Sequence, residues 1–384
     1  MKKKLIRITT VPLSLSGLLQ GQLKFMSKYF EVIGVSSNSK NQLETVSKLE
    51  EIPTIAVEMT RKITPFKDLR AVWQLYKLFK KEKPFIVHSH TPKAGTVAMI
   101  AAKLAKVPHR LHTIAGLPLL EANGFKRRIL NTVEKITYAH ATKIYPNSFG
   151  LYDIILENNF TNRSKLKVIS KGSSNGIDTT YFDPLYDNNS ATKKMLRERL
   201  NIDENDFVFV FMGRLVGDKG INELVLAFDR LCKEHKGIKL LLVGTYENEL
   251  DPLKPEVLDI ITNNTHIITT GWVDEVRPYY AISNALTFPS YREGFPNVVM
   301  QAGAMELPCI VTNINGCNEI IKHQETGIII PVKDEEALYC AMCFIVINKE
   351  QSKTMGIACR KYIAANFERK IVWEAILNEY KQLK

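Results

Sequence analysis

The sequence predicts an α/β protein of two doubly wound domains, each with a parallel sheet. Short apolar runs alternate with longer amphipathic segments through both halves, which is the pattern of βαβ units. The chain has 384 residues, more than a single hydrophobic core usually serves. A stretch rich in Gly, Ser, Asn, Asp and Pro, KGSSNGIDTTYFDPLYDNNS, marks a domain boundary near residue 190.

Charge separates the two halves. Residues 1–190 contain 29 Lys and Arg against 14 Asp and Glu, a net charge of +15, whereas residues 191–384 have a net charge of −3. A basic half indicates an anionic membrane surface or a phosphorylated substrate as partner. Nucleic acid is not an expected partner, because the positive charge is scattered and no DNA- or RNA-binding motif is present.

The first half contains six candidate strands. They are residues 5–9, 32–35, 86–88, 110–113, 143–146 and 167–169. The loop after the first of them, PLSLSGLLQGQ, opens a helix, and its Gly17 either lets a ligand approach the backbone closely or shapes the turn. Near the end of this half, Asn175 in the NGID turn either faces a ligand cleft or serves a purely structural turn.

Two segments of the first half are basic and amphipathic. The segment 66–83, FKDLRAVWQLYKLFKKEK, places its apolar residues on one side, namely Phe66, Leu69, Val72, Trp73, Tyr76 and Phe79. The segment 125–138 repeats the pattern. They are either surface helices packed on the sheet or helices that also contact anionic lipid head groups.

Histidines end two of these strands. His88 and His90 are two positions apart, and His112 precedes a loop that contains a glycine. A zinc site lacks a convincing third ligand, so no metal is expected there. We expect His112 to act on a ligand hydroxyl or proton at the carboxyl end of its strand, with a structural histidine as the alternative.

The second half repeats the doubly wound pattern, with strands in FVFVFMGRL, LLLVG, HIITTGWV, ALTFP, CIVT and GIIIP. In GRLVGDKG, Arg214 leaves a strand and Lys219 precedes a helix, so the two cations should form an anion site. The segment is not a P-loop, and the chain lacks both GxGxxG and a strand-end Asp-x-Asp for a divalent metal. A diphosphate leaving here would be neutralised by Arg214 and Lys219 themselves.

The stretch 289–327 concentrates polar groups at a junction between a strand and a helix. We expect a helix to begin near Asn297, with Asn297 as its N-cap. Glu293 then lies just outside a helix N-terminus at the carboxyl end of a strand, where ligands bind in open α/β sheets. The alternative is an ordinary βαβ loop with a solvated glutamate.

Together, FMGRLVGDKGI, GWVDE and SYREGFPNVVMQAGAMELPCIVTNINGCNEII resemble glycosyltransferase family 4, the retaining nucleotide-sugar glycosyltransferases with the GT-B fold. HSHTPKAG, HTIAGLP and KGSSNGID resemble a bacterial branch that extends lipid-linked oligosaccharides for capsule, O-antigen or glycoprotein glycans. The resemblance implies two Rossmann-like domains facing each other across a cleft. These are an acceptor domain at 1–190 and a nucleotide-sugar domain at 191–365, with a helix at 366–384 that returns to the first.

The resemblance also implies the roles of single residues. Arg214 and Lys219 would bind the donor diphosphate, and Glu293 the hydroxyls of the transferred sugar. The backbone around Phe295, Pro296 and Asn297 would bind sugar and phosphate, Val273 would flank the base, and His112 would reach the donor sugar. The donor would be a UDP- or GDP-linked hexose or N-acetylhexosamine, with no further cofactor and no metal.

Two positions depart from the family pattern. Gln301 stands where the family has a second glutamate that binds the ribose, and an amide binds hydroxyls less strongly than a carboxylate. Glu306 stands where a glycine usually precedes Leu-Pro, which predicts a left-handed residue after a helix. Two further functions stay open, another GT-B enzyme such as an epimerase and a non-catalytic nucleotide-sugar-binding protein.

The expected location is the cytoplasm, at the inner face of the cell membrane. All six cysteines lie in the second half, mostly within apolar patterns, which indicates reduced thiols. No window approaches the roughly 20 apolar residues of a spanning helix. The start, MKKKLIRITT, fits a first strand better than a signal peptide.

Overall fold

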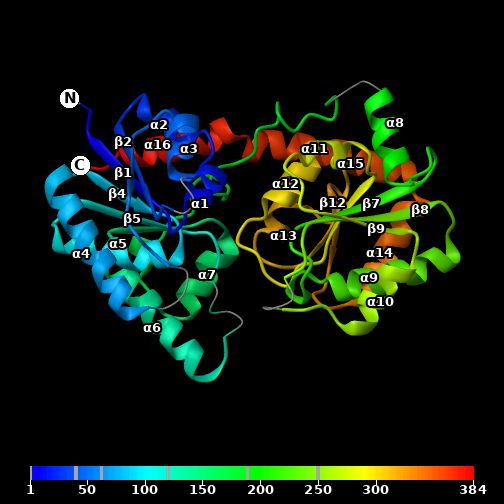
Figure 1. The fold of residues 1–384 in the computed structure, drawn as a ribbon, viewed down its shortest axis with the longest axis horizontal. Helices are drawn as coiled ribbons and strands as arrows, with labels where there is room; N and C mark the ends of the chain where they lie inside the picture. Colours follow the sequence, from blue (N-terminus) through cyan, green and yellow to red (C-terminus); the bar gives the residue numbers. More distant parts are fainter. Residues whose placement is uncertain are drawn as a thin grey trace. The chain divides into compact units, whose positions relative to one another are not determined.

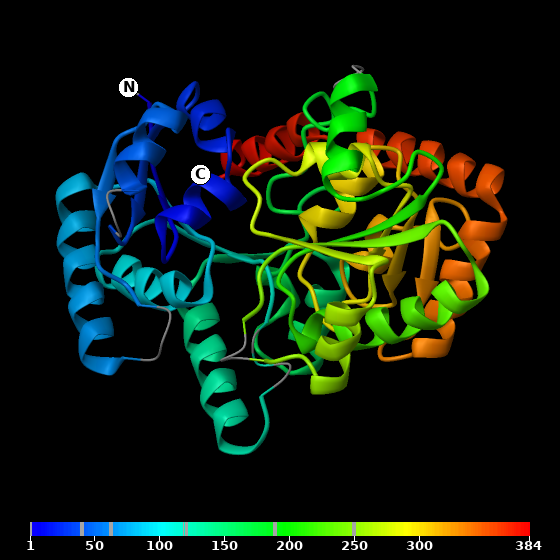
Figure 2. The ribbon, with the colours of Figure 1, turned by 45° about the vertical axis from the view of Figure 1, so that its right-hand side comes forward.

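The computed structural model describes residues 2–38, 42–60, 64–117, 119, 122–186, 190–247 and 251–384. The chain forms two compact units, Met1–Gly176 with Arg369–Lys384 and Ile177–Glu368 (Figure 1). Each unit contains a six-stranded parallel sheet with helices on both faces, as the turned view also shows (Figure 2). The predicted α/β doubly wound class is therefore confirmed.

The first sheet has the strand order β3-β2-β1-β4-β5-β6. Its strands are β1 (Lys4–Ile8), β2 (Glu31–Ser36), β3 (Thr54–Ala56), β4 (Ile86–Ser89), β5 (His109–Ile114) and β6 (Lys143–Pro146). The predicted strand at residues 167–169 is wrong, because the chain there makes only an isolated bridge from Leu166 to Ile144. The short β3, at the sheet edge, had not been predicted.

Alternating side chains on β1 serve two separate cores. Leu5 packs with residues of α1, α2, α3 and α16, whereas Ile6 and Ile8 pack with residues of α4 to α7. The helices of this unit are α1 (Pro12–Leu18), α2 (Gln22–Ser27), α3 (Gln42–Glu50), α4 (Pro65–Glu82), α5 (Pro92–Leu104), α6 (Gly124–His140), α7 (Phe149–Glu157), the short 3-10 helix η2 (Arg163–Lys165) and α16 (Arg369–Lys381).

A buried arginine lies in the middle of β1. Arg7 has no exposed surface, and its guanidinium donates to the hydroxyl of Tyr380 at 2.9 Å and to the amide oxygen of Gln22 at 2.5 Å. Burial lowers the pKa of Arg7, because a buried charge loses its hydration. The first strand and the last helix of the chain are thus joined inside one core.

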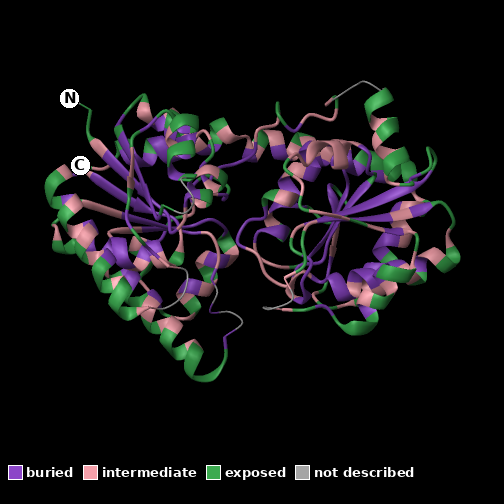
Figure 3. Cartoon of the chain, in the orientation of Figure 1, coloured by how far each residue is buried: buried purple, intermediate pink, exposed green. Residues whose placement is uncertain are grey.

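Helix α4 buries only part of the predicted apolar side, because Phe79 is buried and Val72 and Tyr76 pack partly against the core. Ala71, Leu75 and Phe79 are its buried residues, at four-residue spacing, whereas Phe66 is 89% and Trp73 55% exposed. The small side chain of Ala71 permits a close contact at this position, and the aromatic ring of Phe79 is buried further along the same face. Figure 3 shows the outer faces of α4 and α6 as largely exposed.

The second sheet has the order β12-β11-β10-β7-β8-β9. Its strands are β7 (Phe207–Met212), β8 (Ile238–Val243), β9 (Ile267–Gly271), β10 (Ala285–Phe288), β11 (Cys309–Thr312) and β12 (Gly327–Ile330). All six residues of β7, FVFVFM, are buried, as expected for a central parallel strand covered on both faces.

The helices of the second unit include one with a clear apolar face. In α9, Ile221, Leu224, Val225, Phe228 and Leu231 recur every three or four residues and are all buried. The helices are α8 (Ser190–Arg199), the 3-10 helix η3 (Gly217–Lys219), α9 (Ile221–Glu234), α10 (Pro255–Asn263), α11 (Arg277–Ala281), α12 (Asn297–Ala304), α13 (Cys317–Ile320), α14 (Glu335–Ile347) and α15 (Lys349–Phe367). No helix of the described ranges is long and apolar enough to cross a membrane.

The chain changes units earlier than the boundary expected near residue 190. Ile177 and Phe182 already belong to the hydrophobic core of the second unit. The backbone N–H of Ile177 donates to the carbonyl of Phe367, which fixes this segment beside the end of α15. The chain returns to the first unit at Arg369, where α16 begins.

Glu306 has a left-handed backbone conformation. Its φ is +62°, just after α12 and its C-terminal residue Met305. A residue with a Cβ is disfavoured in this conformation by roughly 1–2 kcal/mol, whereas glycine adopts it freely.

We therefore expect Glu306→Gly to raise the free energy of unfolding by about 1 kcal/mol, measured by thermal denaturation. Glu306→Ala is the matched control, because it removes the side chain but keeps the Cβ. A melting temperature that is unchanged or lowered in Glu306→Gly would contradict the prediction, as would an equal gain in Glu306→Ala.

Candidate functional site

The candidate site of the second unit lies where its strand order reverses. β7 and β10 are neighbours in the sheet, with Ala285 opposite Phe209, but β8 and β9 extend to one side and β11 and β12 to the other. Ligands of open α/β sheets bind in the crevice at such a switch point, beyond the carboxyl ends of the strands. The segments after β7 and β10 carry the charged residues that the sequence singled out.

Lys219 and Glu293 meet at this switch point. Lys219 ends η3 after β7, Glu293 follows β10, and the ammonium Nζ binds the carboxylate Oε1. The Lys219 side chain is 15% exposed and that of Glu293 is 17% exposed. Ser290 Oγ donates to the same carboxylate oxygen at 3.0 Å, and the amide of Asn315 donates to the Glu293 carbonyl. The glutamate is therefore held in place through both its side chain and its backbone.

Arg214 precedes Lys219 in the segment after β7 and pairs with a different carboxylate. It follows β7, and its Nη1 donates to Glu247 Oε2 at 2.6 Å, with the arginine side chain 44% exposed. A second ion pair joins the two loops, since Arg292 Nη2 lies 2.8 Å from Asp218 Oδ2. The loops after β7 and β10 are thus connected by two ion pairs, Lys219 with Glu293 and Asp218 with Arg292.

A close backbone contact brings the two loops together. Gly220 has a φ of +70°, and a Cβ on it would lie 2.2 Å from the carbonyl oxygen of Pro289. Only glycine fits this approach, which places the start of α9 against the end of β10. The N–H of Tyr291 also donates to the carbonyl of Asp218 at 2.9 Å.

The helix that follows Glu293 begins where the sequence indicated, but its cap differs. Asn297 is the first residue of α12, and Pro296 is the N-cap, with no side-chain cap bond. The prediction of Asn297 as N-cap is therefore wrong, because the extended Pro296 precedes it. The Phe295 ring is buried and packs on Phe367 with centroids 5.2 Å apart, so its side chain stabilises the core. What faces outward here is the helix N-terminus, whose first N–H groups lack intrahelical acceptors.

Gln301 lies one turn further along α12. The hydroxyl of Tyr280, from α11, donates to its Oε1 at 3.1 Å. With the carbonyl end of the amide engaged, the N–H₂ end is the one able to meet a ligand hydroxyl. Val273 follows β9 and is half-buried against the core of the unit.

This arrangement can bind an anion and a hydroxylated group side by side. Lys219 and Arg214 supply positive charge after one strand, and the carboxylate of Glu293 accepts hydrogen bonds after the neighbouring strand. A diphosphate and a sugar joined to it present these two chemistries in that order.

Comparison with known proteins gives two family matches. The model "Glycosyl transferases group 1" matches residues 192–362, and "Glycosyl transferase 4-like" matches residues 16–148. The capsular polysaccharide biosynthesis glycosyltransferase CapM of Staphylococcus aureus is 34% identical over 98% of this chain and 97% of its own. The chain belongs to glycosyltransferase family 4.

Other similar proteins have related activities. The UDP-Gal:alpha-D-GlcNAc-diphosphoundecaprenol alpha-1,3-galactosyltransferase of Escherichia coli is 29% identical over 82% of this chain and 79% of its own. The crystal structure of a glycosyltransferase from Rickettsia africae covers 100% of this chain and 98% of its own, with a TM-score of 0.80 and 22% identity. The fold of the glycosyltransferase is thus GT-B, as expected.

In the first unit of the glycosyltransferase, His112 lies near the carboxyl end of β5 but is 3% exposed. Its Nδ1 lies 2.9 Å from Ser89 Oγ, and a Cβ on Gly95 would lie 2.4 Å from its ring. Helix α5 therefore covers the imidazole. Burial lowers the pKa of His112 to about 4, so the ring is neutral near pH 7.

The two other candidates of the first unit have different surroundings. Gly17 is exposed inside helix α1, so the expected loop is wrong, and Gly21 with its φ of +75° makes the turn before α2 instead. Asn175 is buried, and its side chain bonds Gln22, Gln20 and Trp373. These contacts match the alternative of a structural turn, which fastens the end of this unit to α16.

Sequence reasoning missed several residues of the site. Glu247 pairs with Arg214, and Asn315 holds Glu293 by its backbone. Both follow the carboxyl ends of strands that neighbour β7 and β10, namely β8 and β11. A search of every strand end in the sheet for polar side chains would have found them.

Three buried histidines make the first unit sensitive to acid. His88, His90 and His112 are all buried, and burial lowers their pKa values below the ordinary 6.5, with Arg7 adding to the effect at His88 and His90. In the unfolded chain they take up protons below about pH 6.5, whereas the folded unit resists this until lower pH. The free energy of unfolding should therefore fall as the pH drops below about 6.5, at up to about 1.4 kcal/mol per pH unit for each such histidine.

The measurement is a series of thermal denaturations between pH 7.5 and 5. Partly or fully buried carboxyls oppose the trend, because burial raises the pKa of Glu134 to about 6 and also raises the pKa values of Glu50 and Asp218. The three imidazoles of the unfolded chain take up protons from a higher pH, about 6.5, so the fall begins before these carboxyls act. His90→Leu should make the acid-induced fall smaller, whereas His323→Asn at an exposed histidine should leave it unchanged. A melting temperature that stays constant down to pH 5 would contradict the prediction.

Proposed function

We propose that the protein is a retaining, metal-independent glycosyltransferase of capsular polysaccharide synthesis. It moves a hexose or N-acetylhexosamine from a UDP- or GDP-linked donor to a glycan on a polyprenyl diphosphate. The observation that carries the donor assignment is the pairing of Lys219 with Glu293 at the switch point of the second sheet. The names of the similar proteins support the acceptor class, since one acts on a diphosphoundecaprenol sugar and another in capsule synthesis.

The donor fits the site with its diphosphate toward the loop after β7. Its phosphates would compete with Glu293 for Lys219 and with Glu247 for Arg214, because phosphate is a strong acceptor for both cations. Glu293, released from the ammonium, would accept hydrogen bonds from hydroxyls of the sugar. Gln301 would offer its N–H₂ to the ribose.

The transfer step needs no protein nucleophile. The bond from the anomeric carbon to the phosphate oxygen breaks, and the acceptor hydroxyl oxygen bonds that carbon on the same face. The hydroxyl proton passes to the leaving diphosphate, whose growing charge Arg214 and Lys219 stabilise. These two cations support the proposal that no metal is required.

The first unit has surface features suited to binding the anionic inner face of the cell membrane. Its outer helices α4 and α6 expose Phe66, Trp73 and Phe125, the last at 77%. Lys77 lies over the Trp73 ring at 4.8 Å from its centroid. Exposed aromatic residues beside cations are typical of helices that lie at a lipid interface.

The proposed reaction is tested by nucleotide release from a panel of UDP- and GDP-sugars in the presence of EDTA. We expect free nucleotide to appear only when a polyprenyl-diphosphate-linked acceptor is added, at a rate that EDTA does not change. Nucleotide release or sugar epimerisation without acceptor would favour another GT-B reaction. Complete loss of transfer with EDTA would refute metal independence.

The roles of the charged residues are tested by single substitutions. Arg214→Ala and Glu293→Gln should each lower kcat roughly 100- to 1000-fold, because each removes a group that stabilises charge or position in the transition state.

The matched control is Glu336→Gln, which removes an exposed carboxylate of α14 that pairs with Arg230 at 2.5 Å. It should keep wild-type turnover. A Glu293→Gln variant with a normal melting temperature and normal turnover would exclude Glu293 from the site. A protein that binds nucleotide sugars in all variants but shows no turnover in any would be a binding protein.

A further inference from the structure

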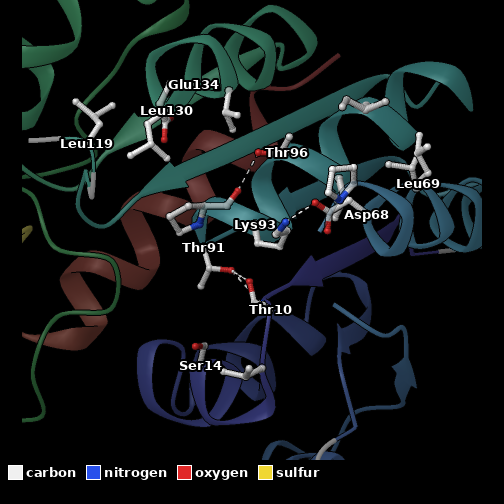
Figure 4. Close-up of a pocket in the computed structure, with 17 residues that line it drawn as sticks. Thr10, Ser14, Asp68, Leu69, Thr91, Lys93, Thr96, Leu119, Leu130 and Glu134 are labelled. Carbon is white, nitrogen blue, oxygen red and sulfur yellow. Dashed lines mark hydrogen bonds and ion pairs between the residues drawn. The ribbon is translucent and has the colours of Figure 1, made fainter. Parts of the chain in front are cut away.

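The first unit contains a large cavity at the switch point of its own sheet. β1 and β4 are neighbours there, while β2 and β3 extend to one side and β5 and β6 to the other. The cavity has a volume of about 720 Å³ and is lined by the segments after β1 and β4 and by helices α4, α5 and α6 (Figure 4). All of its described lining residues belong to the first unit. Its volume falls within the roughly 300–1,000 Å³ of ligand pockets.

The wall of this cavity is mainly apolar. Its aliphatic lining includes Leu69, Val72, Val97, Ile100, Leu130 and Val133. This aliphatic part of the wall offers no hydrogen bonds, so a sugar or base placed against it would lose water without replacement. The same part suits a hydrocarbon chain, which gains about 25 cal/mol for each Å² of apolar surface removed from water. The polar lining residues are Thr10, Ser14, Asp68, Thr91, Lys93, Thr96 and Glu134.

A few polar groups lie together in the same cavity. Thr10 after β1 bonds Thr91 after β4 through their hydroxyl oxygens, 2.7 Å apart. Next to Thr91, Lys93 in the first turn of α5 pairs with Asp68 of α4 at 2.5 Å (Figure 4). The lysine side chain is 12% exposed, so its charge is well placed to bind an anionic group entering the cavity.

Leu69 connects the cavity to the outer face of α4. It lines the cavity and is also 67% exposed, one turn from the exposed Phe66 and Trp73. The entrance therefore continues into the apolar surface that the proposed function places at the membrane. A lipid chain that remains partly in a bilayer could enter the cavity by this route. A freely soluble apolar metabolite would not need an entrance that opens toward a membrane.

We propose that this cavity binds the isoprenoid chain of the polyprenyl-diphosphate acceptor, with Lys93 at its phosphate end. This inference rests on the proposed function and assigns the lipid part of the acceptor to named residues. The apolar wall holds the isoprene units nearest the diphosphate, and Lys93 exchanges Asp68 for a phosphate oxygen. The rest of the chain stays in the membrane beside α4 and α6.

The test measures the dissociation constant for undecaprenyl phosphate in detergent micelles by thermophoresis. Val133→Trp on α6 and Val72→Trp on α4 each fill the cavity from half-buried positions and should weaken binding at least tenfold. Ile136→Trp, three residues further along α6 and 40% exposed outside the cavity, is the matched control and should bind like the wild type. Melting temperatures show which variants are folded. Because the two substitutions lie on different helices, the test remains valid if one of the two variants does not fold.

Two further arms identify the ligand. Lys93→Ala should weaken binding of undecaprenyl phosphate but not of undecaprenol, which lacks the phosphate. Phosphatidylglycerol at equal concentration should not displace undecaprenyl phosphate; equal competition would overturn the isoprenoid assignment in favour of a membrane acyl chain. Unchanged binding in folded Val72→Trp and Val133→Trp would place the lipid elsewhere and overturn the proposal.

The outcome is separable from that of the proposed function. A wild-type enzyme that transfers sugar to a lipid-linked acceptor but shows no binding of undecaprenyl phosphate would overturn the cavity assignment alone. Binding that the cavity variants abolish, with no transfer to any acceptor, would support the cavity and refute the proposed reaction.

Discussion

The candidate donor site depends on the parallel pairing of β7 with β10. This pairing places the loop that ends in Lys219 beside the loop that contains Glu293, although 74 positions separate the two residues. The contact between Gly220 and the Pro289 carbonyl, too close for any Cβ, brings the backbones together before any side chain takes part. The ion pairs then fix the orientation of charges whose proximity the sheet already determines.

Much of the fold could be predicted because long apolar runs leave few alternatives. The buried run of β7 and the regular apolar face of α9 identify themselves by composition and period. The short β3 does not, because its three residues include no buried side chain and pair only at the sheet edge. Residues 167–169 have a strand-like sequence and follow Leu166, which pairs with Ile144 of the edge strand β6, but this pairing stays an isolated bridge and does not extend into a strand.

The positions of site residues directly after strand ends could be predicted. Which side chains pair with one another could not. Lys219 and Glu293 could be placed in one crevice because both come directly after apolar runs. Glu247 and Asn315 also follow strand ends, but their pairing with Arg214 and Glu293 depends on the strand order, which no local pattern reveals. The buried side of α4 was predicted only in part, because Ala71, a residue of little hydrophobicity, is buried there, whereas the larger Phe66 and Trp73 are exposed.

The two sheets share one strand order but differ in what their switch points hold. The second presents an ammonium and a carboxylate after β7 and β10, and the first presents an aliphatic cavity after β1 and β4. The same backbone geometry thus creates both candidate binding sites. The side chains of the adjoining loops and helices determine which kind of ligand each site can bind.

The bond between Arg7 and Tyr380 has a consequence for the order in which the chain folds during synthesis. The second unit is continuous in sequence, whereas the core of the first unit needs α16, which follows the whole second unit in the sequence. Until Tyr380 arrives, the guanidinium of Arg7 lacks a partner that it has in the finished core. The first unit can therefore be completed only after the second unit has been synthesised, although its sequence begins first.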